Sequence, residues 1–205
     1  MSENMKLWRN VCITDPSAVK SITGKQYKGN SPKPYWLIEQ ATKAFGPCGI
    51  GWGINVVSER FERFGETESL HIAQVKVWYM LDGKRGEIEQ MGQTRSSYVT
   101  SSGKFTVDED APKKSVTDGM VKCLSMLGFA GDIFSGRWDD SRYVEFAGNH
   151  HAAAEQIAAI ESAKTIDLLK SHFAAAWKMS DDKMRTAIKT AYDTRLQQLT
   201  PKEPA

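Results

Sequence analysis

The chain has 205 residues, of which 40% are hydrophobic and 25% charged, and its 27 basic and 25 acidic residues leave a formal net charge of +2. This balance excludes a protein dominated by a long disordered or strongly basic tail, and the length suffices for one domain, or one with a small appendage. Three scattered cysteines without a C-x-x-C pattern imply neither a disulfide framework nor a zinc ribbon, and predict a reducing, cytoplasmic setting. No apolar run reaches the roughly 20 residues that cross a bilayer, so we expect no membrane partner.

The stretch from Pro16 to Ile38 has an unusual charge pattern. It contains four lysines, no acidic residue and three interleaved aromatic residues, which are Lys20, Lys25, Lys28 and Lys33 with Tyr27, Tyr35 and Trp36. Glycines and prolines in this stretch predict a loop. A helix is expected to begin at Pro34, because proline suits a first helical turn, and to end before Gly46-Pro47.

From Gly49 the apolar period changes from helical to alternating, which predicts a strand over residues 49–57 with Trp52 in the core. Glycines at 49, 51 and 53 would leave one face of that strand bare, so that another element can approach closely. A second strand is predicted over residues 70–81, a turn over 82–86 and a third strand over 87–99. The expected arrangement is an antiparallel three-stranded meander.

An apolar stripe at helical spacing predicts a further helix from Pro112 to Leu127, ended by Gly128. Three shorter helices are expected over residues 152–163, 166–178 and 181–199, with Thr165 and Ser180 as candidate caps. The predicted class is α+β, with the meander packed on helices and a small helical C-terminal region. We expect a core domain over residues 1–148, a helical region over 149–199 and a flexible tail over 200–205.

Catalytic patterns are mostly absent from the sequence. His150 and His151 are adjacent, so they diverge on either a helix or a strand and form no natural metal pair. Asp139 and Asp140 in a polar loop are more typical of solvated or capping carboxylates than of a metal site. There is no phosphate-binding loop of the G-x-x-x-x-G-K-[ST] type, and Cys123 lies on an apolar stripe that predicts a core position. We expect no catalytic residue, metal or cofactor.

Two blocks of sequence resemble the Rad fifty-two single-strand annealing superfamily. The first runs from Trp36 to Gly46 and continues to Gly51-Trp52, and the second runs from Lys113 to Met120 and continues to Leu127-Gly128. With the meander between them, the blocks cover about residues 20 to 135. The Phe-Gly-Pro-x-Gly-Ile-Gly-Trp-Gly form that begins at Phe45 is similar to bacteriophage members of the Sak type.

The resemblance implies a β-β-β-α core, assembled into homo-oligomeric rings or filaments, whose groove holds single-stranded DNA by its backbone. It implies a recombination mediator that anneals complementary strands without ATP, in the DNA repair and recombination of a bacterial or phage-infected cell. It further implies that the C-terminal helices bind a single-stranded-DNA-binding protein. Lysines that neutralise phosphates and aromatic rings that stack on bases suit such a binder.

The family's DNA-contacting residues carry over only in part. After Thr-Asp-Gly the family has two adjacent basic residues, and one helical turn later it has a third. The corresponding positions here are Val121, Lys122 and Ser125, of which Lys122 is basic. The predicted DNA-binding set is Lys25, Lys28, Lys33, Lys104, Lys113, Lys114 and Lys122, with Lys76 and Arg95 as weaker candidates. We expect Lys122→Ala to weaken DNA binding, unless Lys122 only forms a helix-surface ion pair with Asp118.

Two other functions are consistent with the residues. The near-neutral charge and the missing basic residues at Val121 and Ser125 favour an oligomeric protein-interaction scaffold without DNA binding. Asp139, Asp140 and the two histidines are the candidates for a metal-dependent nuclease. A small net charge is nevertheless compatible with DNA binding in an oligomer, because a few lysines repeated in every subunit build a continuous basic track.

Overall fold

The structure is a computed structural model that describes residues 2–22, 29–180 and 182–200. The chain divides into two units, Met1–Asp139 (unit 1) and Asp140–Ala205 (unit 2). Unit 1 combines an antiparallel sheet with helices and unit 2 is helical, so the α+β class is confirmed. The predicted tail beyond residue 200 lies outside the described residues.

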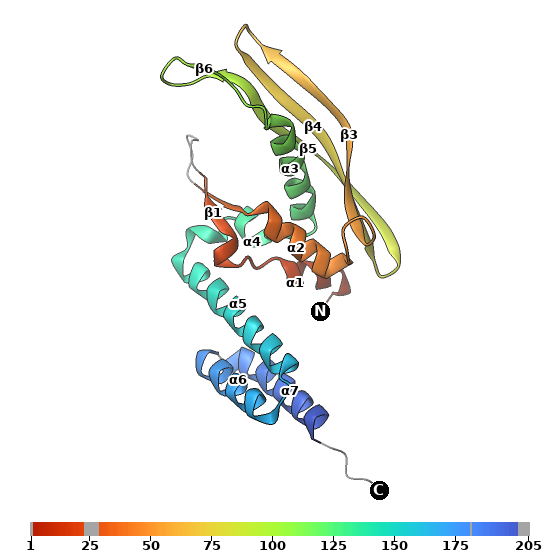
Figure 1. Ribbon diagram of the computed structural model, residues 1–205, viewed down its shortest axis with the longest axis vertical. Coiled ribbons are helices and arrows are strands. Elements are labelled where there is room, and N and C mark those ends of the chain that lie inside the picture. Colours follow the sequence, from red (N-terminus) through yellow and green to blue (C-terminus); the bar gives the residue numbers. More distant parts are fainter. Residues whose placement is uncertain (1, 23–28, 181, 201–205) are drawn as a thin grey trace. The chain divides into compact units, whose positions relative to one another are not determined.

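The main sheet of unit 1 has four antiparallel strands in sequential order (Figure 1). They are β3 (Trp52–Phe64), β4 (Glu68–Leu81), β5 (Lys84–Val99) and β6 (Phe105–Val107). The predicted three-stranded meander is therefore incomplete, because β6 adds a fourth strand that pairs with residues 97–99 of β5. Asp82 and Gly83 form the β4–β5 turn with positive φ angles of 49° and 74°, as a two-residue hairpin turn requires.

The start predicted for the first long strand is wrong. Residues 47–51 form a turn, in which the Gly51 nitrogen donates to the Pro47 oxygen at 2.8 Å, and β3 begins at Trp52. The glycines therefore do not line one strand face, although two of them do permit close approach. A Cβ at Gly51 would collide with the Phe45 carbonyl, and one at Gly53 would lie 2.9 Å from the indole nitrogen of Trp78.

One face of the sheet is covered by α3 (Ala111–Met126), which packs on β4 and β5. Ala73, Val75 and Val77 alternate along β4 on this face and are buried, as the period-two pattern predicts. Backbone meets backbone where α3 crosses β5, since a Cβ at Gly92 would collide with the carbonyl oxygen of Ser115. The helix–sheet core depends on this close contact.

The helix α2 (Pro34–Phe45) is confirmed at both ends, and its residues Leu37, Ala41 and Phe45 are buried. Trp52 is 1% exposed, as predicted, and its indole donates to Thr42. The helix α3 lies within one residue of its predicted limits, and Cys123 on its inner face is fully buried.

The N-terminal segment contains regular elements that the sequence does not predict. They are α1 (Lys6–Val11), β1 (Val19–Ser21) and β2 (Asn30–Pro32), with short 3-10 helices at Glu3–Met5 and Pro16–Ala18. The described part of the predicted loop thus contains a small two-stranded sheet. The buried carboxylate of Asp132, in α4 (Gly131–Phe134), accepts from the Thr14 amide and hydroxyl and from the Trp138 indole in the 3-10 helix Arg137–Asp139. These bonds tie the N-terminal segment to the rest of unit 1.

Unit 2 consists of α5 (Ser141–Ser162), α6 (Ile166–Met179) and α7 (Asp182–Leu199). Its core consists of buried Ile160, Ala163, Leu169, Ala176, Ile188 and Ala191. The start predicted at Ala152 is wrong, because Asp140 caps a helix that begins at Ser141. The boundary expected near Gly148 falls inside α5. Thr165 caps α6 as predicted.

Candidate nucleic-acid interface

Of the seven lysines predicted to bind DNA, Lys25 and Lys28 lie outside the described residues. The other five all belong to unit 1, at three places. Lys33 precedes α2, Lys104 lies in the β5–β6 hairpin, and Lys113, Lys114 and Lys122 lie on α3.

The first turn of α3 holds Lys113 and Lys114, both exposed. Lys113 lies 2.9 Å from Asp110, and Lys114 lies 2.6 Å from Asp108. The hydrogen bonds that the two ammonium groups donate to these carboxylates raise the pKa of both lysines, so both are cationic at neutral pH. The Lys113 side chain is 83% exposed and that of Lys114 55%, which leaves both ammonium groups accessible to a ligand.

Lys104 lies close to this helix start in the chain, in the turn between β5 and β6. The turn is closed by the Thr100 amide, which donates to the Lys104 oxygen at 2.9 Å. Among the described residues, no carboxylate lies within ion-pair distance of the Lys104 side chain. Lys104 therefore presents an uncompensated charge at the hairpin.

The start of α2 combines a lysine with aromatic residues. Lys33 is exposed, and its ammonium group donates to the Ser17 carbonyl at 2.8 Å. Tyr35 is 84% exposed and lines a shallow groove with Lys33 and Trp36. No acidic residue lies in the first turn of α2. A cation beside an exposed ring is the combination that a single-stranded nucleic acid uses for phosphate and base.

Lys122 has a different environment from the other lysines. Its ammonium group donates to Asp118 at 2.8 Å and to the Met91 carbonyl at 3.2 Å, while Asp118 also accepts from the Gln93 amide. The ion pair that sequence reasoning weighed against DNA contact is thus present. Together the two side chains satisfy backbone groups of β5, which is a structural role.

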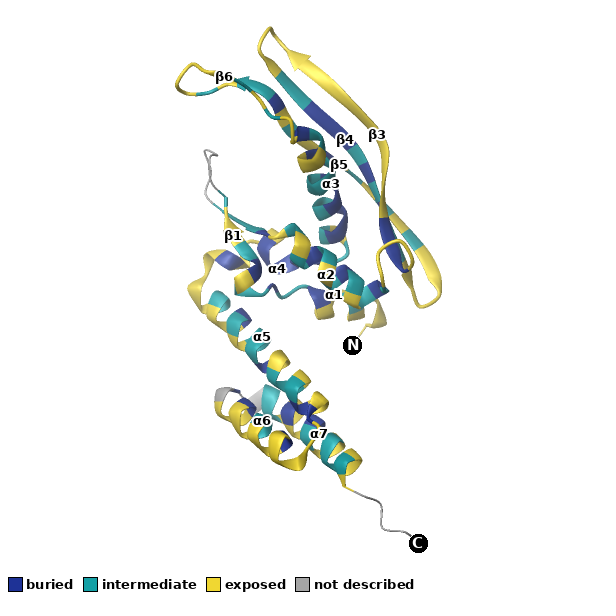
Figure 2. Cartoon of the chain, viewed as in Figure 1, coloured by how far each residue is buried: buried dark blue, intermediate teal, exposed yellow. Residues whose placement is uncertain are grey.

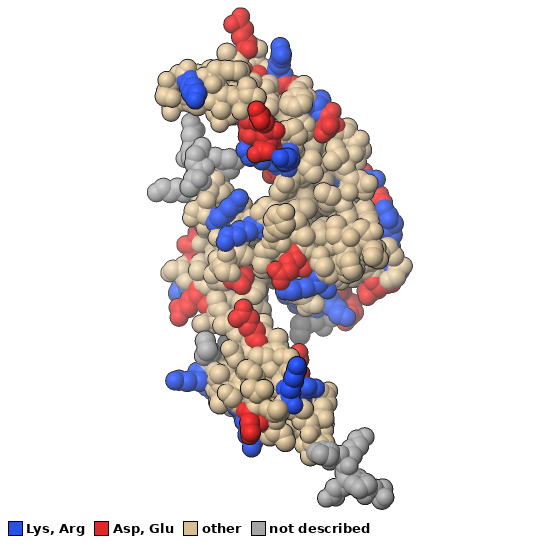
Figure 3. Space-filling view, viewed as in Figure 1, with Lys and Arg blue, Asp and Glu red and all other residues tan. Residues whose placement is uncertain are grey.

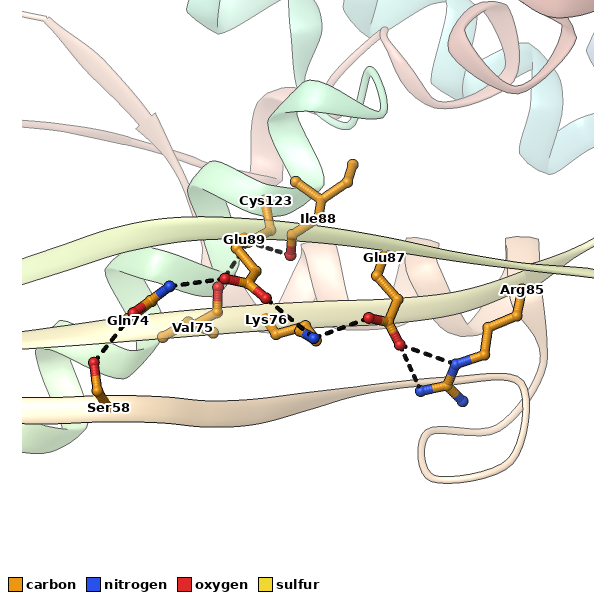
Figure 4. Close-up of polar contacts among 9 residues, drawn as sticks. All are labelled: Ser58, Gln74, Val75, Lys76, Arg85, Glu87, Ile88, Glu89 and Cys123. Atoms are coloured by element: carbon orange, nitrogen blue, oxygen red, sulfur yellow. Dashed lines mark hydrogen bonds and ion pairs between the residues drawn. The ribbon is translucent and has the colours of Figure 1, made fainter.

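The weaker candidate Lys76 lies on the sheet face opposite α3, in a polar network shown in Figure 4. It bridges Glu87 at 2.9 Å and Glu89 at 3.0 Å. Hydrogen bonds from Lys76 lower the pKa of both glutamates, so both carry charge at neutral pH. Arg85 also pairs with Glu87 at 3.0 Å, so the two carboxylates balance the two cations of the network. The Lys76 side chain is 29% exposed and is shared between both glutamates, which leaves it less accessible to phosphate than Lys113 or Lys114. Arg95 is exposed on the same face.

The surface of unit 1 contains both mixed-charge regions and basic regions. On the face drawn in Figure 3, basic side chains lie beside acidic ones in several places. Basic side chains lie without acidic neighbours below the gap beside β1, whereas acidic and basic side chains lie together above it. Lys20 of β1 is exposed and adds a further cation to this region. It pairs in register with Ser31 of β2, two residues before Lys33.

The alternative metal site is not assembled in the described part of the chain. Asp140 caps α5 and pairs with Arg142 at 3.0 Å, and hydrogen bonds from Arg142 lower the pKa of Asp140. Among the described residues, no three His, Cys, Asp or Glu side chains are placed to hold a metal ion together. Burial raises the pKa of the Cys123 thiol, which disfavours a nucleophilic thiolate. No helix in the described ranges has the length and apolarity needed to span a membrane.

Unit 2 contains a pocket of about 450 Å³ with a mixed polar and apolar lining. Its residues include Arg142, Lys178 and His150 beside apolar Phe146 and Met184, and Glu145 is the acidic member. Burial, and secondarily the neighbouring His151, lower the pKa of His150. Arg142 is already paired with Asp140, whereas no carboxylate among the described residues lies within ion-pair distance of Lys178.

Tyr35 and Lys20 are interface candidates that the predicted set omits. Their signal was present in the sequence as aromatic residues interleaved with lysines, but only the structure shows which rings are exposed. Comparison of the sequence with family models and with curated proteins finds no match.

Proposed function

We propose that the protein binds single-stranded DNA and anneals complementary strands without ATP, acting as a homo-oligomeric ring or filament. The observation that carries the proposal is the pair of helix starts in unit 1. Lysine occupies the position before α2 and two positions in the first turn of α3, and neither first turn contains an acidic residue.

Lysine at a helix N-terminus opposes folding, because the N-terminal end carries partial positive charge that favours anions. The same charge, with exposed backbone amides, attracts phosphate. Asp108 and Asp110 relieve part of the repulsion at α3 in the absence of a ligand. Residues that break a local folding rule at two neighbouring elements are expected at functional sites.

The exposed ring of Tyr35 supports a single-stranded partner over a duplex. Its face can stack on an unpaired base while Lys33 contacts the adjoining phosphate, and this contact requires no particular base. Strands held by their backbones keep their bases available for pairing, and duplex formation supplies the free energy of annealing. A net charge of +2 provides few contacts for each chain, so repetition in an oligomer is needed for tight binding.

Filter binding in EDTA separates this proposal from its alternatives. We expect retention of labelled single-stranded DNA without metal. Absence of binding by the folded chain would favour the interaction scaffold, and magnesium-dependent cleavage would favour a nuclease.

The resemblance also implies a single-stranded-DNA-binding protein as partner, and we assign its binding to the pocket of unit 2, where Lys178 lies beside apolar Phe146 and Met184. Lys178→Glu in the full chain should leave annealing of bare DNA unchanged and impair annealing of DNA coated with that protein. Equal rates on coated DNA for both chains would exclude the pocket from partner binding.

A further inference from the structure

The two edges of the main sheet differ. β3 forms one edge of the four-stranded sheet, pairing with β4 alone. Every residue from Ile54 to Phe64 in this strand is exposed, as Figure 2 shows by its yellow ribbon. An exposed strand of this length offers a row of unpaired backbone groups to another strand.

The opposite edge is covered in part. β6 covers residues 97–99 of β5, and further along β5 the side chains of Asp118 and Lys122 bond the Gln93 amide and the Met91 carbonyl. An incoming strand would have to displace these bonds. Within the described part of a second copy of unit 1, β3 is therefore the strand with the longest continuous open edge.

The outer half of β3 carries two apolar rings that are largely exposed. Phe61 is 63% exposed and Phe64 is 49% exposed. Phe61 nevertheless has a defined position, because its ring packs edge-on against the buried His71 at 4.8 Å. His71 also lies 3.5 Å from Glu59. The ring and the carboxylate are thus held in place at the open edge.

The charges of β3 are self-complementary around Phe61. The segment reads Ser58-Glu-Arg-Phe-Glu-Arg-Phe64. In an antiparallel pair of two copies centred on Phe61, Glu59 faces Arg63 of the second copy and Arg60 faces Glu62. By symmetry each of these opposite-charge pairs occurs twice, and directly opposed unlike charges stabilise antiparallel pairs.

We propose that β3 is a homo-oligomer interface, in which residues 58–64 of two copies pair antiparallel about a two-fold axis through Phe61. A register centred on Arg60 places the two Arg60 side chains opposite each other, and a register centred on Glu59 does the same for Glu59, so both are opposed by like charge. The bulge between Val56 and Ser58 and the β3–β4 turn after Phe64 delimit the paired segment.

This interface would make the open edge of the sheet a contact between subunits. It rests on the homo-oligomeric part of the proposed function and names the surface that two copies share. A two-fold axis relates the DNA-binding surfaces of the two copies. DNA strands bound to them would run in opposite directions, as the two strands of a duplex do. The interface accounts for one subunit contact, and a ring or filament needs a second one.

Disulfide cross-linking of the full chain without DNA tests the register. In the proposed pairing the two copies of position 61 face each other, with Cα atoms about 4.5–5.5 Å apart, which is within disulfide range. Phe61→Cys, in a Cys48→Ser background, should therefore form a covalent dimer under mild oxidation.

The matched control is Ser58→Cys in the same background. Ser58 is also exposed on β3, but in the proposed register the two copies of position 58 lie about 20 Å apart, which is too far for a disulfide. We expect about tenfold or more covalent dimer from Phe61→Cys than from Ser58→Cys. Equal yields from the two variants would overturn the proposal.

A mixing experiment tests the charge pairing without introduced cysteines. Glu59→Arg/Glu62→Arg and Arg60→Glu/Arg63→Glu each oppose like charges and should weaken self-association in analytical ultracentrifugation. An equimolar mixture restores every opposite-charge pair and should restore association. No recovery on mixing would overturn the interface. Because neither experiment includes DNA, a negative result is independent of whether the chain binds and anneals DNA.

Discussion

The double substitution Lys113→Gln/Lys114→Gln tests the α3 start as a phosphate site. It removes two exposed cations and leaves Asp108 and Asp110 without their partners. Each phosphate contact on a single strand contributes about 0.7 to the slope of log affinity against log salt, so two contacts lower the slope by about 1.4. At about 0.1 M salt the same two contacts correspond to a loss of roughly 25-fold in affinity.

The assay is fluorescence anisotropy of a labelled oligothymidine over a series of salt concentrations. Glutamine keeps most of the aliphatic length of lysine, and its neutral amide suits a helix N-terminus better than a cation does, so we expect no loss of thermal stability. The control Lys84→Gln removes an exposed lysine at the far end of β5, next to the β4–β5 turn. If the double variant kept the wild-type slope while folded, the α3 start would not contact phosphates.

Three further predictions concern single side chains. Tyr35→Ala should weaken single-stranded DNA binding by about 1–3 kcal/mol, whereas Tyr35→Phe should bind as wild type, since a ring is what stacks; equal losses in titrations of both variants would argue against stacking. Lys122→Gln should lower the thermal midpoint and leave the salt slope of DNA binding unchanged, because its ammonium group bonds Asp118 and the Met91 carbonyl; a flatter slope would return Lys122 to the interface. Burial lowers the pKa of His150 in the folded chain, so the unfolded state takes up this proton first and stability falls as pH drops below about 6.5. His150→Gln should reduce that fall in urea unfolding at pH 7.5 and pH 5, and an unchanged pH dependence would contradict the cause.

The long elements of unit 1 were predictable because local signals and tertiary packing agree there. Pro34 and Gly46 mark the ends of α2, and its apolar spacing matches the face it buries. The alternation of β4 matches its burial between β3 and β5 under α3. Such agreement between propensity, pattern and packing is what makes an element readable from sequence.

The short and shifted elements were not predictable for equally physical reasons. β1, β2 and β6 have three residues each, too few to show a period, and they exist through pairing with a neighbour. α5 begins well before the alanine-rich stretch because the Asp140 cap decides its start, and the helix tolerates Gly148 in its interior.

The candidate site was predictable in its residue types but not in its pairing. The lysines and aromatic residues are visible in the sequence, whereas their partners depend on the folded chain. Lys114 reaches Asp108 only because the turn before α3 brings the carboxylate back to the helix start. The sequence suggested the Lys122–Asp118 pair, but not that Lys122 also bonds the β5 backbone or that Lys76 bridges two glutamates of the neighbouring strand.

The most direct test of the proposed function is the annealing rate of two complementary labelled oligonucleotides in EDTA without nucleotide triphosphate. The proposal predicts that the wild-type chain accelerates annealing well above the spontaneous rate, that Lys113→Gln/Lys114→Gln and Tyr35→Ala both reduce this acceleration, and that Lys84→Gln does not. A folded wild-type chain that leaves the spontaneous rate unchanged would contradict it.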